Sequence, residues 1–255
     1  MEDKVLAVVA NYDFSENADR LKECLSSEYK TMLLDNSSPV PPRTADVILP
    51  NLRYTGLWNA SVRLALEQRK KWLLFVASDI QIPDAGLLAR CAKSALDKSS
   101  IGIYTAALRE DSRLSYTACF LRKTGKMREC YVTEGFFFLA RTRILESLYP
   151  VPPEKCRFGF GLDLMTAYHA YRSGYKVVVD DRVVIYHPAA IHETPIEQAV
   201  AEQRNYTGPE GSQFREWLCE RLRREGRSNE VPRTLGRNCW SCVLRLLASC
   251  RLPVP

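Results

Sequence analysis

The 255-residue sequence predicts an α/β protein whose mostly parallel β-sheet is covered by helices on both faces. Strand and helix patterns alternate through the first half of the chain, which is typical of βαβ units. Several of the strand patterns are continuous apolar runs, which is typical of strands buried inside a sheet. A hydrophobic content of 46% supplies enough apolar residues for a full core.

The elements of the first half follow one another closely. We expect strands at residues 4–12, 30–36, 46–50, 72–80 and 101–108. We expect helices at residues 17–27, 55–71 and 84–96. Within the first of these helices, Leu21, Cys24 and Leu25 recur at helical spacing and predict its buried side.

The second half has a less regular pattern. Residues 114–132 predict an antiparallel excursion that turns at Gly125, and residues 134–142 predict a strand. A helix follows, Gly174 stops it, and one or two strands lead from there to His187. Beyond that point the pattern is helical.

The C-terminal part of the chain is basic. Residues 201–255 contain ten Arg, no Lys and six Glu, which is +4 of the net charge of +6. We expect residues 1–200 to form one domain and residues 201–255 a basic helical extension. The extension either contacts anionic partners, such as lipids, nucleic acid or an acidic acceptor, or is a solvated helix with its own ion pairs.

The end of this extension has two further features. Residues 239–252 predict an amphipathic helix that either packs on the first domain or lies on a membrane. Cys239 and Cys242 have the spacing of a metal or redox pair, but no second pair or nearby His completes such a site. No apolar run is long enough to span a bilayer, and the nine scattered Cys favour reduced thiols in the cytoplasm. We therefore expect a cytoplasmic protein, with peripheral membrane contact as an option.

Polar side chains follow three of the predicted strands at the point where each strand ends. These residues are Asn11, Asp35 and Asp79. Because ligands bind at the carboxyl ends of parallel strands, we expect a binding site at this edge of the sheet. Asp79 must be solvated, paired or bound to a metal there; the alternative role, capping the next helix, suits Asp84 better.

Five segments in order resemble family 2 glycosyltransferases, the nucleotide-sugar-dependent GT-A enzymes related to rhamnosyltransferases. The segments are "VVANYDFSENADRLKECLSS", "LLDNSS", "NLRYTGLWNASVRLAL", "GLDLMTAYHAYRSGY" and "VVIYHP", which together cover residues 4–190. The resemblance implies a GT-A-like, Rossmann-like fold. It also implies transfer of a sugar from a nucleotide diphosphate-sugar, UDP- or dTDP-linked, to an acceptor hydroxyl of a glycan, a glycolipid or a nucleic acid.

The resemblance also implies roles for particular residues. Asp79 and His187 would hold Mn²⁺ or Mg²⁺, and Asp163 would be the general base of an inverting single displacement. The nucleotide-binding residues would be Asn11, Asp35, Asn36, Asn59 and Ser78. Glu134 and Gly135 would line the acceptor pocket.

Purely structural roles compete with several of these assignments. His187 suits a structural histidine at a strand end, Asp163 suits a helix cap, and Asp35 with Asn36 suits a simple turn. His169 and His192 have no comparable support for a site role.

The chain departs from the family pattern at three positions. Ala77, Leu162 and Met165 stand where the family often has a polar or acidic residue. This loss of carboxylates motivates a second hypothesis, a nucleotide-sugar-fold protein that binds its ligand without catalysis. A third hypothesis, a DNA-modifying enzyme that acts on a hydroxylated base, rests on the Arg-rich extension and on "FGFGLD", which resembles lead-ins of DNA-base-glucosylating GT-A branches.

Overall fold

The computed structural model describes residues 4–112, 119–188 and 196–227. In these residues the strands are β1 (Val5–Asn11), β2 (Lys30–Asp35), β3 (Val47–Ile48), β4 (Trp72–Ala77), β5 (Ile101–Leu108), β6 (Met127–Glu129), β7 (Phe137–Arg141) and β8 (Lys176–Ile185). The helices are α1 (Ser15–Ser26), α2 (Arg53–Glu67), α3 (Ala85–Leu96), α4 (Thr142–Glu146), α5 (Leu162–Arg172) and α6 (Ile196–Arg224).

The strands form one mixed sheet in the order β3-β2-β1-β4-β7-β5-β8-β6. β1 runs parallel to β2 and to β4, and β5 runs parallel to β8. β7 enters antiparallel between β4 and β5, and β6 closes the far edge antiparallel to β8. All residues of β1 and β5 are buried, as their apolar runs predict. The predicted α/β class is confirmed.

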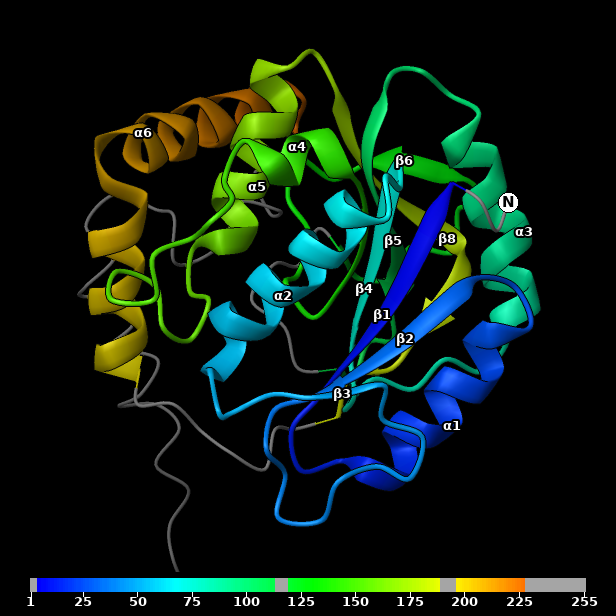
Figure 1. Cartoon of the computed structure of the whole chain (residues 1–255). Helices are drawn as coiled ribbons and strands as arrows, with labels where there is room; N and C mark the ends of the chain where they lie inside the picture. The colour runs from blue at the N-terminus through cyan, green and yellow to red at the C-terminus, as the bar shows by residue number, and fades with distance from the viewer. Residues whose placement is uncertain (1–3, 113–118, 189–195, 228–255) are drawn as a thin grey trace, which may run out of the picture.

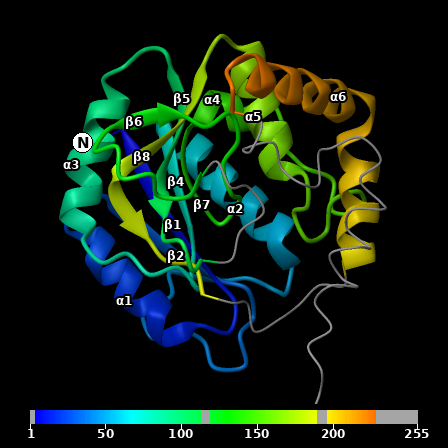
Figure 2. The ribbon, with the colours of Figure 1, turned by 180° about the vertical axis from the view of Figure 1, so that it is seen from behind.

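Helices cover both faces of this sheet. α1 and α3 pack on one face, against β1, β2, β5 and β8, and lie to the right in Figure 1. α2, α4 and α5 cover the other face, and α6 packs on the outside of α5. Figure 2 shows the same layers from behind. The carboxyl ends of β1 and β2 lie at the lower side of Figure 1, where α2 also begins.

The third strand is shorter than its pattern predicts. We expect residues 46–50, and the structure has Val47–Ile48 at the edge of the sheet. Pro50 has no amide hydrogen and cannot donate to the ladder, so the pairing stops after Leu49 donates to the carbonyl of Asp35 at 2.7 Å. The shorter strand brings the chain directly to the start of α2.

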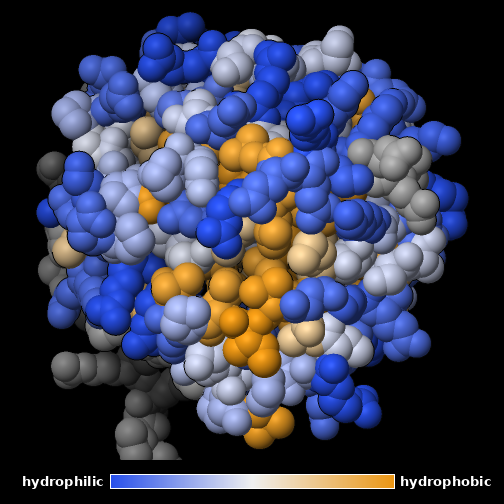
Figure 3. Space-filling view, in the orientation of Figure 1, coloured by the Kyte–Doolittle hydropathy of each residue, from blue (hydrophilic) through white to orange (hydrophobic). Residues whose placement is uncertain are grey.

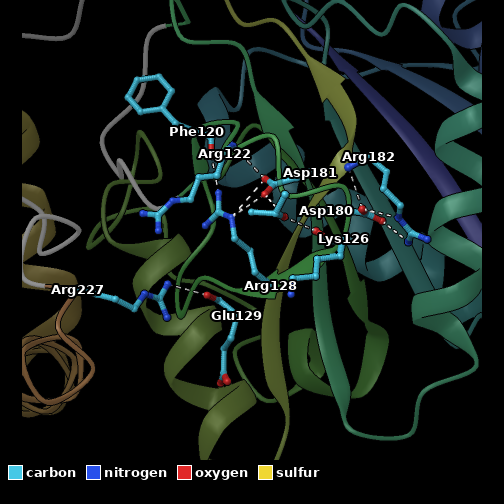
Figure 4. A network of polar contacts seen from close by, with 10 residues as sticks. Phe120, Arg122, Lys126, Arg128, Glu129, Asp180, Asp181, Arg182 and Arg227 are labelled. Atoms are coloured by element: carbon cyan, nitrogen blue, oxygen red, sulfur yellow. Dashed lines mark hydrogen bonds and ion pairs between the residues drawn. The ribbon is translucent and has the colours of Figure 1, made fainter.

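The predicted antiparallel excursion is β6, which a buried ion pair ties to β8 (Figure 4). The carboxylate of Asp181 accepts bonds from Arg128 Nε at 3.2 Å and from the Thr124 hydroxyl at 2.6 Å. Its neighbour Asp180 pairs with Arg182 at 2.7 Å. Because each buried carboxylate has a cationic partner, both acids have a structural role.

α6 belongs to the stretch predicted as a basic extension, and it runs through residue 200 with a kink at Gly208. Its apolar side is buried through Phe214, Leu218 and Leu222. Residues 201–227 contain six Arg and five Glu. Arg221 and Arg227 both pair with Glu225, and Arg224 pairs with Glu220. In the described residues the ion-paired helical face is therefore confirmed.

The remaining predictions for the C-terminus fall on residues 228–255, including Cys239, Cys242 and the amphipathic segment, and lie outside the described residues. His192 lies outside them too. Within the described ranges, each helix is too short or too polar to traverse a lipid bilayer. The division of the chain at residue 200 stays a prediction.

Apolar side chains gather in a band across the middle of the face shown in Figure 3, where Figure 1 places α2, β2 and β3. The most exposed large apolar residues near these elements are Val40, Ile48 and Leu52, with 73%, 62% and 41% of their surface accessible. Met32, Val47 and Leu64 are partly buried beside them. The sheet edge next to α2 is therefore less covered than its centre.

Candidate functional site

Asp79 lies two residues after β4, a central strand that the apolar run of residues 72–77 predicts. Its backbone surroundings are held firmly. Ser78 donates its N–H to the carbonyl of Ala10 at 3.0 Å, and Asn17 of α1 donates its side-chain amide to the carbonyls of Ser78 and Ile80. The cap of α3 is Asp84, whose Oδ1 accepts from Leu87 N at 2.7 Å. Asp79 therefore has no capping role, as the sequence predicts.

His187 lies opposite Asp79 although 108 residues separate them in the chain. Its Nε2 is 3.1 Å from Asp79 Oδ2. The imidazole is 7% exposed and stacks on Phe136 with ring centroids 4.0 Å apart. A two-residue bridge between Gln81 and Tyr186 brings the ends of β4 and β8 together beside it. The structure thus places Asp79 and His187 next to each other, and their role as metal ligands stays a prediction.

One oxygen of Asp79 is left without a partner. Oδ1 is buried and has no hydrogen-bond donor among the residues that the structure describes. A buried carboxylate oxygen without a donor is unfavourable, and a bound divalent cation would satisfy it. The residues present therefore fit a metal of the Mn²⁺ or Mg²⁺ type. The described residues contain no cluster of three or more His, Cys, Asp or Glu side chains, so the remaining ligands would have to be water and phosphate oxygens.

Asn11 and Asp35 meet at the ends of β1 and β2, as predicted. Both are fully buried, and Asn11 Nδ2 donates to Asp35 Oδ1 at 2.8 Å. The hydroxyl of Ser38 donates to the same oxygen at 2.6 Å, and Ser38 N donates to Asp35 Oδ2 at 3.0 Å. This network fixes the loop after β2 in place. Asp35 thus accepts more hydrogen bonds than a simple turn would need.

The other predicted nucleotide-binding residues are placed differently. Asn36 is buried and accepts from Leu52 N at 2.7 Å, which joins the loop after β2 to the start of α2. Asn59 donates to the carbonyl of Val151 at 2.8 Å and accepts from its N–H at 2.9 Å. Of the predicted site residues, all of them described, only Asn59 lines the cleft of about 560 Å³ between α2 and residues 149–157. Its amide is committed to holding that loop.

Asp163 lies in the first turn of α5. The cap position belongs to Gly161 with φ of +90°, so Asp163 is not the cap. Its Oδ1 accepts from Leu164 N at 2.7 Å, and the helix dipole favours its ionised form. The loop before it is held from α6, since the Glu202 carboxylate accepts N–H bonds from Phe158 at 2.8 Å and Phe160 at 3.1 Å. A residue of the predicted extension therefore positions the loop that leads to Asp163.

Tyr54 is the site residue that sequence reasoning missed. Its hydroxyl donates to the carbonyl of Gly135 at 2.6 Å. Burial raises the pKa of Tyr54 well above its usual value, and the negative charges of Asp163 and Asp79 raise it further. The charges of the predicted base and of the predicted metal ligand therefore both reach this phenol. It stays protonated as a hydrogen-bond donor.

Glu134 and Gly135 lie at the lead-in to β7. Glu134 is 5% exposed, and its charge contributes to raising the pKa of the Cys119 thiol. Gly135 is the acceptor of the Tyr54 bond, and the carbonyl of Phe136 accepts from Ala77 N at 2.8 Å. This segment therefore joins the neighbourhood of Tyr54 to that of Asp79. Contact of either residue with an acceptor stays a prediction.

Comparison with known proteins was made by sequence and by structure. No protein-family model and no curated protein matches the sequence. Solved structures do match. Pyrobaculum calidifontis mannosyltransferase PcManGT, in complex with GDP-Man and Mn²⁺, aligns with 99% of this chain and 81% of its own, at TM-score 0.53 and 14% identity. S. aureus TarS 1–349 aligns with 86% of this chain and 72% of its own, at TM-score 0.58 and 16% identity.

A third match is GalNAc-T7 with UDP, GalNAc and Mn²⁺, at TM-score 0.59 and 9% identity. It covers 90% of this chain and 58% of that protein. The chain has a GT-A fold. At these identities the likeness establishes the fold and does not extend to a particular family within it. The predicted GT-A architecture is thus confirmed, and the resemblance to rhamnosyltransferase-related members stays a prediction.

Tyr54 and Glu202, which sequence reasoning missed, share a reason. Tyr54 stands inside the motif "NLRYTGLWNA", but an aromatic residue near a helix start is usually core and signals no chemistry. Glu202 is one of many acids in a charged helix pattern. The glycine pattern "FGFG" was the available signal, because Gly159 has φ of +83° and passes Tyr54 closely.

We predict that Gly159→Ala destabilises the protein through contact with Tyr54. A Cβ at this position would lie 2.1 Å from Tyr54 Cδ1. Gly174→Ala is the matched control, because it has φ of +77° with no atom within 4 Å of the added Cβ. Left-handed strain alone costs about 1–2 kcal/mol. Gly159→Ala should exceed the control by roughly 1–3 kcal/mol in chemical denaturation, as overpacking does.

A double-mutant cycle isolates the contact. In a Tyr54→Ala background the added methyl group has room, so the excess cost of Gly159→Ala should disappear. An excess that persists without the Tyr54 ring would mean that backbone strain, and not the ring, requires glycine here.

Proposed function

We propose that the chain is an inverting glycosyltransferase that moves a sugar from a nucleotide diphosphate-sugar to an acceptor hydroxyl. The observation that carries the proposal is the half-buried Asp79–His187 pair, whose second carboxylate oxygen has no partner among the described residues, at the carboxyl edge of a GT-A sheet. Matching structures contain GDP-Man with Mn²⁺ and UDP-GlcNAc, which supports a nucleotide-sugar donor. The donor is UDP- or dTDP-linked in this proposal.

Asp79 and His187 would hold Mn²⁺ or Mg²⁺ through one carboxylate oxygen and one imidazole nitrogen. When bound, the cation supplies Lewis-acid neutralisation of the charge that develops on the leaving diphosphate. Asp79 has to stay ionised for this role, and the stacking of His187 on Phe136 holds the imidazole in one orientation.

The donor nucleotide is assigned to the edge formed by β1, β2 and β4. Asn11, Asp35, Asn36 and Ser78 lie at that edge. The bonds from Asn11 to Asp35 and from Leu52 N to Asn36 preorganise the loops that would contact the base and ribose. Asn59 is assigned a supporting role, because its amide is occupied by Val151.

Asp163 is assigned as the general base. It takes the proton from the acceptor hydroxyl as that oxygen attacks the anomeric carbon, and a single displacement inverts the configuration there. The hydrogen bond from Tyr54 to Gly135 holds the acceptor side in a fixed position relative to the loop before Asp163. Glu134 and Gly135 are the proposed acceptor contacts, and the acceptor class is a glycan or glycolipid.

A second candidate function is donor binding without turnover. It is favoured by the small number of candidate metal ligands, since no third His, Cys, Asp or Glu joins Asp79 and His187 in the described part of the chain. The nucleic-acid acceptor has less support, because the Arg residues of 201–227 are nearly balanced by Glu.

A donor screen separates these functions. Released nucleotide is measured for UDP-, dTDP- and GDP-sugars with acceptor glycans, in Mn²⁺ and in excess chelator. We expect release above background for one donor class, and loss of that release on chelation. Donor binding in calorimetry with no release for any acceptor would favour the binding protein. Full activity in chelator would remove the metal from the mechanism.

A further inference from the structure

A strongly basic pocket lies at the strand ends opposite to Asp79, where α2 ends and α4 begins (upper side of Figure 1). Its volume is about 370 Å³. The lining residues are Leu66, Arg69, Lys70, Lys71, Arg141, Thr142, Arg143 and Glu146. Five of these eight are basic and one is acidic. This is a denser concentration of positive charge than the ion-paired surface of α6.

The tertiary structure assembles this pocket from two short basic runs. Residues 69–71 precede β4, and residues 141–143 run from the last residue of β7 into α4. The antiparallel pairing of the two strands places Trp72 opposite Arg141, and Thr142 N donates to the carbonyl of Lys71 at 2.9 Å. The two runs are therefore fixed side by side, at the strand ends farthest from Asp79.

The basic residues of the pocket have different roles. The Arg141 guanidinium is used by the fold, because it donates to the carbonyl of Ile101 at 2.7 Å and lies over the Trp72 ring. Arg69, Lys71 and Arg143 are exposed, and none of them forms an ion pair with a carboxylate in the described residues. Arg143 also lies over the Tyr175 ring, a contact that leaves its charge in place. The three charges are therefore not neutralised within the described fold.

Thr142 adds an independent observation. It is 4% exposed, and its hydroxyl is buried with no hydrogen-bond partner in the described part of the chain. Such a hydroxyl is unfavourable unless a further group pairs with it. A phosphate group has several acceptor oxygens and about two negative charges, so it can accept from the hydroxyl and from several cationic side chains at once.

We propose that this pocket binds the phosphate group of a small phosphorylated compound. Lys71 and Arg143 supply charge, the Thr142 hydroxyl donates one bond, and Leu66 provides an apolar wall for the rest of the compound. The concave shape and the buried hydroxyl favour a small ligand over a flat lipid surface. The site is separate from the proposed donor site and does not depend on it.

Inorganic phosphate is the probe, titrated into the full chain and followed by ³¹P NMR at constant ionic strength. We expect saturable binding. Lys71→Gln combined with Arg143→Gln should weaken it at least ~10-fold, because charged partners dominate phosphate recognition. Arg90→Gln combined with Lys93→Gln on α3 removes the same charge from another exposed surface and should change affinity less than about 2-fold.

Thr142→Val tests the hydroxyl separately, since valine keeps the shape of the side chain. We expect roughly 3–10-fold weaker phosphate binding, with a melting temperature no lower than that of the unsubstituted protein. If both double substitutions weakened phosphate binding equally, the effect would come from the overall charge of the protein, and the proposed site would be wrong. Unchanged affinity in Thr142→Val would also overturn it. No nucleotide sugar is present, so either result leaves the glycosyltransferase proposal untouched.

Discussion

Asp79→Asn is expected to lower the rate of sugar transfer by at least ~10²-fold and to weaken Mn²⁺ binding. The substitution keeps the size of the side chain and removes its charge, so a hard divalent cation loses its anionic ligand. Steady-state nucleotide release measures the rate. Mn²⁺ electron paramagnetic resonance measures binding without turnover.

Asp84→Asn is the matched control for this variant. Asp84 lies five residues further along the same loop and caps α3, and Asn caps a helix about as well as Asp. We expect wild-type rates and Mn²⁺ affinity. If Asp79→Asn also behaved as wild type in both measurements, the carboxylate would be structural and the metal would bind elsewhere.

The second large effect is expected at Asp163. Asp163→Asn preserves the bond from Leu164 N and the shape of the first turn of α5, but the amide cannot accept the acceptor proton. We therefore expect transfer to fall ~10²–10⁴-fold while nucleotide-sugar affinity stays within a few-fold.

Two measurements keep the Asp163 result interpretable. The unfolding free energy is measured beside the rate, since loss of folding would lower activity for another reason. Glu134→Gln is the comparison variant, because Glu134 is a second carboxylate that the sequence predicts on the acceptor side. Normal transfer by Asp163→Asn with a collapsed rate in Glu134→Gln would move the base to Glu134.

Much of the fold is predictable because it depends on local patterns. The apolar runs at β1, β4 and β5 predict buried strands, and the structure buries nearly every residue in them. Asp84 before an apolar helix predicts its cap. The polar residues at strand ends predict one common edge, and the bond between Asn11 and Asp35 confirms it.

Other features have no local signal. β7 enters antiparallel between β4 and β5, and that insertion determines the neighbours of both strands. Asn59 matches a motif by position, yet its amide is committed to Val151, which lies 92 residues away in sequence. A residue type specifies which bonds a side chain can make, and only the packed chain decides which partner is in reach.

The sequence by itself determined the α/β class, the strand-end location of the site and the identity of Asp79, His187 and Asp163 as its candidates. Tertiary structure alone decided three things: that Asp79 meets His187 and keeps one oxygen unpaired within the described residues, that the charges of Asp79 and Asp163 both act on Tyr54, and that two basic runs form one pocket. The physical reason is range. Periodicity and capping act over a few residues, whereas these contacts join segments that only sheet pairing and helix packing bring together.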